Sequence, residues 1–106
     1  MPTPFQNAVY AALKRVPRGR VTTYGALAHR VGCRSARAVG QALKRNPYAP
    51  KVPCHRVIAS DLAPGGFMGR RDPPAMRRKL KLLAKEGVRF QAGQLAEPRR
   101  LFAFPG

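Results

Sequence analysis

The sequence predicts a mainly α-helical domain with a small β element, built around a helix-turn-helix. Apolar residues recur at helical intervals in several segments, and proline and glycine separate those segments. One glycine-containing turn lies between two short helical segments, the second of which is rich in arginine and small residues. A chain of 106 residues buries only a modest core, so we expect a single domain over residues 1–106.

The first amphipathic helix is expected close to the N-terminus. Apolar residues that share one helical face recur there, namely Phe5, Val9, Ala12, Leu13 and Val16. Proline and glycine in residues 17–19 then end the segment.

The helix-turn-helix is expected over about residues 22–45. Thr22 or Thr23 can cap its first helix, which ends at Gly32, where a left-handed C-cap is easily formed. Ser35 can cap the second helix, whose small and apolar residues form one stripe made of Ala38, Val39, Ala42 and Leu43.

The second half of the chain divides into four segments. Residues 46–58 form an active-site segment that breaks the preceding helix at Asn46-Pro47, runs rigidly through Pro50 and Pro53, and ends in a short buried strand, Val57-Ile58. Residues 62–70 form a glycine-containing pocket loop, and the tail at 88–106 is either a strand or an ordered extension. A last helix over about residues 74–86 carries an apolar stripe of Met76, Leu80, Leu83 and Ala84, surrounded by the basic residues Arg77, Arg78, Lys79, Lys81 and Lys85.

The charge balance indicates a polyanionic partner. The chain has 21 Lys and Arg against 4 Asp and Glu, a formal net charge of +17. It contains no apolar run near the ~20 residues of a membrane span and no signal-peptide pattern, so we expect a cytoplasmic, nucleoid-associated protein without a membrane partner. Two cysteines and two histidines at these spacings form no zinc framework, and we expect no metal and no cofactor.

The run Pro53-Cys54-His55-Arg56-Val57 places a potential nucleophile beside a potential base. A thiol at its ordinary pKa of about 8.5 needs a base or a positive field to become a thiolate near neutral pH. Neighbours in an extended strand point to opposite faces, so Cys54 and His55 can cooperate only if the backbone turns there or a water bridges them. The other interpretation is that Cys54 is an inert, small apolar residue of the core.

Several motifs resemble the C-terminal domain of O6-alkylguanine-DNA alkyltransferases, in the family's order and spacing over roughly residues 5–90. The motifs are Ser35–Gly40, Asn46-Pro47, Pro53–Ile58, Gly66–Gly69 and Leu82–Gly87. The resemblance implies a winged-helix-like, DNA-binding helix-turn-helix domain. It also implies an activity, the irreversible, single-turnover transfer of an alkyl group from guanine O6 to the protein's own cysteine.

The resemblance assigns five residues to the chemistry. Cys54 would accept the alkyl group, and His55 would take its proton through a water. Glu86 would orient and polarise His55, which is the logic of a catalytic triad applied to displacement at an alkyl carbon. Asn46 would brace the active-site turn, and Tyr24 would protonate the departing guanine. From the residues alone, Glu86 could instead be a solvated helix end and Tyr24 an ordinary half-buried aromatic.

The resemblance also implies how DNA would be held. A thiol cannot reach O6 inside a duplex, so the nucleotide must be flipped out, and Arg37 would fill the gap in the stack, although by itself it could be one more phosphate contact. The second helix would lie in the minor groove, where small residues permit close approach. The expected DNA-binding residues are Arg37, Thr23, Ser35, Ala36, Ala38, Gly40, Gln41, Arg45 and Arg56. The expected alkylguanine pocket consists of Tyr24, Val52, Pro53, Val57, Ile58, Phe67, Met68 and Gly69.

The compact layout and the segment Glu86–Phe90 also resemble the single-domain alkyltransferase-like proteins. Those proteins usually carry tryptophan or alanine in place of the cysteine, bind alkylated guanine without repairing it, and attract nucleotide-excision repair. One departure from the alkyltransferase pattern is Phe67, which stands where those proteins usually have a tyrosine. We therefore expect a monomeric, alkyl-accepting repair protein that binds double-stranded DNA containing O6-alkylguanine. A non-enzymatic lesion sensor that recruits nucleotide-excision repair, and more weakly a small transcription regulator, are the alternatives.

Overall fold

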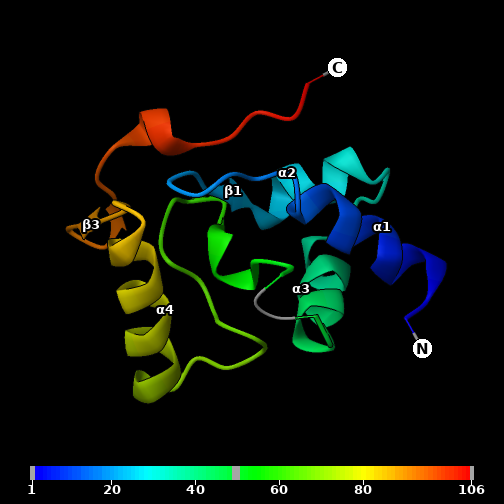
Figure 1. The fold of residues 1–106 in the computed structure, drawn as a ribbon, viewed down its shortest axis with the longest axis horizontal. Coiled ribbons are helices and arrows are strands. Elements are labelled where there is room, and N and C mark those ends of the chain that lie inside the picture. The colour runs from blue at the N-terminus through cyan, green and yellow to red at the C-terminus, as the bar shows by residue number, and fades with distance from the viewer. Residues whose placement is uncertain (1, 49–50, 106) are drawn as a thin grey trace.

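The computed structural model describes residues 2–48 and 51–105 and confirms the mainly helical fold class (Figure 1). Helices α1, α2 and α3 pack together on one side of the molecule, and α4 stands apart from them, with the active-site segment between. The elements in chain order are α1 (Pro4–Leu13), β1 (Thr22–Thr23), α2 (Tyr24–Arg30), α3 (Ala36–Lys44), η1 (Cys54–Arg56), β2 (Val57–Ile58), α4 (Pro73–Lys85), β3 (Phe90–Gln91), β4 (Gln94–Leu95) and η2 (Pro98–Arg100).

Helix α1 begins with a capping box. The hydroxyl of Thr3 accepts from the Gln6 amide at 3.1 Å, and the Gln6 side chain accepts from the Thr3 amide at 2.9 Å. The helix ends at Leu13, one turn earlier than the apolar pattern predicts. Val16 therefore lies in the following turn, although its side chain is buried in the core as the pattern requires.

The helix-turn-helix is confirmed with its local signals. Thr23 caps α2 by accepting from the Ala26 amide at 3.0 Å, and Ser35 caps α3 by accepting from the Ala38 amide at 3.0 Å. Gly32 has a φ of +74° just after α2, the left-handed conformation expected of it. Val39, Ala42 and Leu43 face the core, while Ala38 is half-buried.

Two residues that were expected only as helix caps also form a strand. Thr22 pairs with Val57 and Thr23 with Ile58, so that β1 and β2 lie parallel. The strand at Val57-Ile58 is confirmed, and it brings the start of α2 next to the active-site segment. Because the partners are 35 residues apart, local sequence could not indicate this pairing.

The tail is ordered and folds back over the first half of the chain. Strands β3 and β4 form an antiparallel hairpin, and Val21 forms a parallel bridge with Leu101. The amide of Val21 donates to the carbonyl of Arg100 at 2.9 Å, and the amide of Phe102 donates to the carbonyl of Val21 at 2.7 Å. A small second core results, made of Val21, Ile58, Leu83, Val88 and Leu95.

The buried face of α4 differs from the prediction. Its inward residues are Ala75, Lys79 and Leu83, four positions apart, whereas the side chain of Leu80 is 37% exposed. The predicted apolar stripe is therefore wrong at its centre. Lys79 takes the buried position that was expected for Leu80. The cause lies in the residues opposite, which present carbonyl oxygens to α4.

The backbone turns at Cys54, which is one of the two conditions under which Cys54 and His55 could cooperate. Asn46 leaves α3, and the chain reaches a 3-10 turn, η1, that contains Cys54 and His55. Pro50, part of the predicted rigid path, lies outside the described residues. Within residues 2–48 and 51–105, the structure contains no helix that is both long and apolar enough to cross a bilayer.

A candidate active site at Cys54

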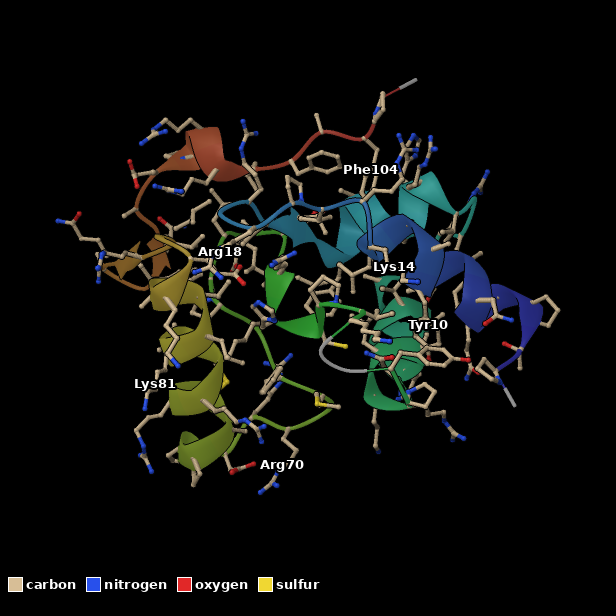
Figure 2. The ribbon with its side chains drawn as sticks, viewed as in Figure 1. Tyr10, Lys14, Arg18, Arg70, Lys81 and Phe104 are labelled. Carbon is tan, nitrogen blue, oxygen red and sulfur yellow. The ribbon has the colours of Figure 1, made fainter. Side chains whose placement is uncertain are left out.

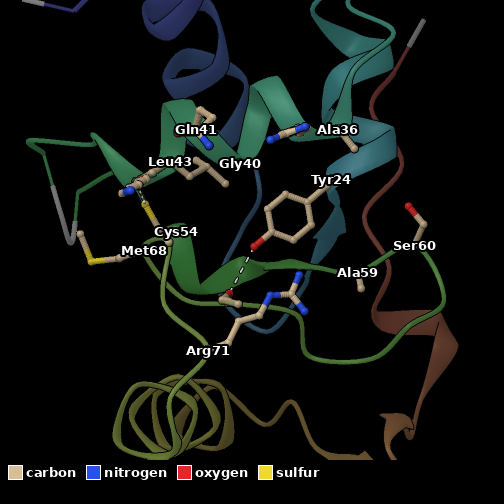
Figure 3. A pocket seen from close by; sticks show the side chains of 14 residues that line it. Tyr24, Ala36, Gly40, Gln41, Leu43, Cys54, Ala59, Ser60, Met68 and Arg71 are labelled. Carbon is tan, nitrogen blue, oxygen red and sulfur yellow. Dashed lines mark hydrogen bonds between the residues drawn. The ribbon is translucent and has the colours of Figure 1, made fainter.

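A cavity of about 450 Å³ opens beside Cys54, between α3, the start of α2 and the loops that follow β2 (Figure 3). Tyr24 enters it from α2, and its ring points into the space. Of the predicted pocket and DNA-binding residues, the cavity is lined by Tyr24, Ala36, Arg37, Gly40, Gln41, Met68 and Gly69. Residues from distant parts of the chain therefore share one cavity with the cysteine.

Cys54 is held in the wall of this cavity by Asn46. The side-chain amide of Asn46 donates to Sγ at 2.8 Å and to the carbonyl of Val52 at 3.2 Å, and its oxygen accepts from the Tyr48 amide at 2.9 Å. The thiol lies 3.9 Å from the carbonyl oxygen of Leu43. Asn46 thus holds both the thiol of Cys54 and the segment that leads into it.

The environment of the thiol has opposing effects. Burial raises the pKa of Cys54 because it disfavours the thiolate, and the hydrogen bond from Asn46 and the positive charge of Lys79 act in the opposite direction. The side chain of Cys54 is 5% exposed, yet it reaches the cavity. Such a thiol needs a base, or a nearby positive charge, to lose its proton when it reacts. His55, the next residue in η1, is a candidate base.

His55, Arg56 and Glu86 form a partly buried cluster behind the cysteine. Nε2 of His55 lies 2.9 Å from Oε2 of Glu86, and the guanidinium of Arg56 donates from Nε and Nη2 to both carboxylate oxygens at 2.9 Å. Burial by itself would raise the pKa of Glu86, but the hydrogen bonds from Arg56 and His55 outweigh it and lower the pKa to about 2. Glu86 is therefore an ionised acceptor at neutral pH.

This ionised carboxylate fixes the orientation and tautomer of His55. A carboxylate can only accept, so Nε2 of His55 carries the proton and Nδ1 is left as the basic nitrogen. This geometry allows His55 to act as a base that Glu86 orients, the roles that the sequence analysis expects of them. Glu86 is the C-cap of α4, 31 residues from His55, so only the folded chain brings them together.

Arg56 requires a correction. It was grouped with the residues expected to contact DNA, but its Nη1 donates to the carbonyl of Val16 at 2.9 Å, and its Nε and Nη2 donate to Glu86. All three interactions point into the protein, and the side chain is only 17% exposed. Arg56 is thus a positioning residue for Glu86.

Tyr24 projects from the start of α2 into the cavity. Its Oη donates to the carbonyl of Gly66 at 3.2 Å, and burial is the main reason that the pKa of Tyr24 is raised, which keeps the phenol protonated. Gly65, next in the loop, has a φ of +71°, and a Cβ added there would lie 3.2 Å from Cε2 of Tyr24. Glycine is needed at that position so that the loop can pass the ring.

Five predicted pocket residues lie behind the cavity instead of in its lining. Their side chains are buried in the core, and the five are Val52, Pro53, Val57, Ile58 and Phe67. The lining also contains Gly66, which lies in the predicted pocket loop, and five residues that sequence reasoning missed, namely Leu43, Lys44, Ala59, Ser60 and Arg71. Ala59 and Ser60 directly follow the strand that was predicted, and this adjacency was the one signal that could have indicated them.

The predicted DNA-binding residues of α3 lie around the cavity mouth or on the same helix. Ala36, Arg37, Gln41 and Arg45 are exposed, and a Cβ added at Gly40 would meet nothing within 4 Å. Helix α3 therefore has a sterically open surface at Gly40, with the exposed side chains of Arg37 and Gln41 beside it. Thr23 and Ser35 use their hydroxyls as helix caps, and basic side chains such as Arg70 and Lys81 project from other faces of the molecule (Figure 2).

Residues 4–88 match the family model of the 6-O-methylguanine DNA methyltransferase DNA-binding domain. The chain is 49% identical over 88 residues to the methylated-DNA–protein-cysteine methyltransferase of Thermococcus sibiricus, a match that covers 82% of this chain and 46% of that protein. It is similar in structure to Mycobacterium tuberculosis OGT in complex with DNA, with a TM-score of 0.73, 40% identity, and 82% and 51% of the two chains covered.

A second structural similarity covers whole chains. S. pombe Atl1, in complex with damaged DNA containing O6-carboxymethylguanine, has a TM-score of 0.79 and 35% identity, with 98% of this chain and 100% of that chain covered. By contrast, the chain spans about half the length of the curated methyltransferases that it matches.

Proposed function

This chain belongs to the family of the 6-O-methylguanine DNA methyltransferase DNA-binding domain, and on that premise we propose that it repairs O6-alkylguanine in DNA by accepting the alkyl group on Cys54. The observation that carries the proposal is that Asn46 and the His55–Glu86 pair lie around Cys54, which lines the cavity. A nucleophile, a base and an orienter are the parts that covalent catalysis by a thiol requires.

The transfer proceeds as a displacement at the alkyl carbon. The thiol gives its proton to Nδ1 of His55 through a bridging water, and the sulfur–carbon bond forms as the carbon–O6 bond breaks. The electron pair of the broken bond passes to guanine, which takes a proton from the hydroxyl of Tyr24. Proton exchange with solvent returns His55 and Tyr24 to their starting states, while Cys54 stays alkylated, so that each molecule acts once.

DNA is the proposed partner because the target base must be presented to a recessed thiol. We expect the protein to act as a monomer on double-stranded DNA, with α3 in the minor groove, where the open surface at Gly40 permits close approach. The base is flipped into the cavity, and Arg37 at the cavity mouth fills its place in the stack. Affinity should fall steeply with salt, since Lys and Arg release counterions from phosphate, and this same attraction would concentrate the protein on the nucleoid.

The decisive experiment is the intact mass of the protein after incubation with a duplex that carries one O6-methylguanine. We expect a gain of one methyl group in the wild type and none in Cys54→Ser, and peptide mapping should place the methyl on Cys54. Unchanged mass in a protein that binds the lesion tightly would refute alkyl transfer.

That second outcome corresponds to a non-enzymatic lesion sensor, which is favoured by one observation, the match to Atl1 over 98% of this chain and 100% of that chain. In this case Cys54 would only line the pocket, and the bound lesion would be passed to nucleotide-excision repair. A sensor should bind O6-methylguanine duplex in preference to an unmodified duplex and should bind equally well as Cys54→Ser.

The role of Arg37 has its own test. Arg37→Ala should weaken binding to a lesion duplex far more than binding to an unmodified duplex, because only lesion binding requires the flipped state. Arg45→Ala on the same helix is the control for loss of one positive charge. Equal losses on both duplexes for Arg37→Ala would contradict the intercalating role.

A further inference from the structure

An open groove lies between α4 and the β3–β4 hairpin. It has a volume of about 260 Å³, and its lining consists of Leu80, Ala84, Val88, Arg89 and Phe90. Four of these five side chains are apolar, and Leu80 is exposed to solvent, whereas Leu83 on the opposite face of the same helix is fully buried. A single exposed leucine needs no explanation, but a leucine in a preformed apolar groove offers a contact that a partner could use.

A row of basic side chains runs along this groove. The row lies on one face of α4 at intervals of four residues, is exposed along its length, and consists of Arg77, Lys81 and Lys85. Residues three apart on a helix are surface neighbours, so Arg77 lies beside Leu80, and the next turn repeats this relation with Lys81 beside the groove. Arg89 adds a positive charge within the lining itself. The apolar groove therefore has a cationic border.

Within residues 2–48 and 51–105, the chain supplies no acidic side chain to this border. Three of its four acidic residues form ion pairs elsewhere, and these are Asp72 with Arg70, Glu86 with His55 and Arg56, and Glu97 with Arg99 and Arg100. The carboxylate of the fourth, Asp61, accepts from the amide of Ala63. A cationic border without counterions in the chain is complementary to a partner that presents acidic and apolar side chains together.

The groove is separate from the surface proposed for DNA. Helix α4 stands apart from α1, α2 and α3, and the side chain of Lys81 projects away from those helices (Figures 1 and 2). The groove shares no lining residue with the cavity at Cys54. DNA phosphates also attract lysine and arginine, but a phosphate backbone gains nothing from an apolar groove with an exposed leucine. The combination of charge and apolar surface therefore favours a protein segment over DNA.

We propose that this groove is a docking site for an acidic, amphipathic segment of a partner protein. Apolar side chains of the segment enter the groove beside Leu80, and its carboxylates pair with the basic row on α4. A groove of about 260 Å³ admits one or two anchoring side chains, so the charges contribute to the choice of partner as well as to affinity. The partner and DNA can be bound at the same time, because they use different surfaces. The inference holds whether or not Cys54 accepts an alkyl group.

The test uses two fluorescein-labelled peptides of identical composition. The first is a helical peptide of about 16 residues with leucines along one face and glutamates on both flanks, and in the second the leucines are scattered around the helix. Fluorescence anisotropy measures binding at about 0.15 M NaCl, where attraction between distant exposed charges is largely screened. We expect the amphipathic peptide to bind at least about tenfold more tightly than the scattered peptide, because only it presents an apolar face to the groove.

Three variants locate the binding surface. Leu80→Gln removes the exposed apolar side chain without a change in charge, and Lys81→Glu reverses one charge of the basic row. Lys14→Glu is the matched control, because Lys14 is also exposed but lies at the end of α1 (Figure 2). We expect Leu80→Gln and Lys81→Glu each to weaken binding of the amphipathic peptide by about tenfold, and Lys14→Glu by less than about twofold. All three positions are exposed, so the variants should fold, which circular dichroism checks.

Other occupants of the groove would give different results. If the groove binds DNA, Lys81→Glu should weaken binding of an O6-methylguanine duplex as much as Arg45→Glu does, and saturating duplex should displace the peptide. If it binds a second copy of the chain, sedimentation should show a dimer that Leu80→Gln converts to a monomer. Either result would overturn the proposal, as would equal binding of the two peptides, no binding of either, or equal effects of Lys81→Glu and Lys14→Glu. Peptide binding that persists on the DNA-saturated protein is the result we expect.

Discussion

Glu86 and Glu97 bind cationic side chains in nearly the same way but in different settings. Each carboxylate accepts from the Nε of an arginine, and Nη1 of that arginine donates to a carbonyl in the connection between α1 and β1, Val16 for Arg56 and Gly19 for Arg100. The carboxylate side chain is 8% exposed at Glu86 and 38% exposed at Glu97.

The two clusters show that burial, more than the list of partners, decides what an ion pair does. Water competes for Glu97 and screens its charge, so the pair contributes little to stability. Glu86 is withdrawn from water, depends on its partners, and in return fixes His55 next to the nucleophile. Each of the following predictions compares the two carboxylates or their arginines.

The largest difference should follow from removal of each carboxylate charge. Glu86→Gln should lower the free energy of unfolding by about 3 kcal/mol, because it leaves the half-buried guanidinium of Arg56 without its counterion. It should also slow methyl transfer by on the order of 100-fold, since Gln does not hold His55 as a base. Urea denaturation and single-turnover kinetics measure the two effects. Glu97→Gln is the matched control and should change neither beyond experimental error; equal effects of the two variants would contradict the comparison.

Acid should reveal the same difference without a mutation. The folded pKa of Glu86 is about 2 and its ordinary value is 4.5, so below pH 4.5 the unfolded chain binds a proton that the folded protein does not. The stability that Glu86 contributes is present above pH 4.5 and is lost as the pH falls toward 2, on the order of 2 kcal/mol. Urea denaturation between pH 5 and pH 2 should show this slope in the wild type and in Glu97→Gln. A slope that persists undiminished in Glu86→Gln would assign it to another group.

The two arginines should differ by a smaller amount. Arg56→Lys keeps the charge but loses the bidentate contact with Glu86 and the bond to Val16, and we expect a loss of about 1–2 kcal/mol. Arg100→Lys, whose guanidinium is more exposed, should lose less than about 1 kcal/mol. Thermal unfolding of the two variants beside the wild type gives the order, and a larger loss in Arg100→Lys would reverse it.

Salt should give the smallest effect. At 1 M NaCl the attraction between exposed charges is largely screened, whereas partly buried pairs are screened much less. The destabilisation caused by Glu86→Gln should therefore persist in 1 M NaCl with little change, as measured by thermal unfolding in both salt concentrations. A destabilisation that disappears in high salt would place Glu86 in the same class as Glu97.

The helix ends could be predicted because each depends on neighbouring residues. Thr23 and Ser35 cap their helices through bonds to amides three positions ahead, and Gly32 takes the left-handed conformation where α2 stops. The buried face of α4 could not be predicted in the same way. The acceptors that hold Lys79 come from residues 57–66, and no pattern within the helix reports them.

In the candidate site too, the residue types could be predicted from the sequence, whereas their contacts could not. Cys54, His55, Asn46, Tyr24 and Glu86 were identified by their residue types and by the family motifs around them, and the structure gathers them at or behind one cavity. Their chemical roles stay predictions. The error over Arg56 arose because an arginine beside an active site has the same sequence signature whether it points outward to phosphate or inward to a carboxylate.

The sequence by itself determined the order of helices, their caps, the excess of positive charge and the set of reactive residue types, because these depend on residue chemistry over a few positions. The tertiary structure alone decided which charges are buried. Glu86 pairs with His55 across 31 residues and Lys79 reaches Val57 across 22, whereas Glu97 meets Arg100 three positions away. An ionised group remains in the interior only where the fold supplies its partners from elsewhere in the chain, and those partners exist in place only once the chain has folded.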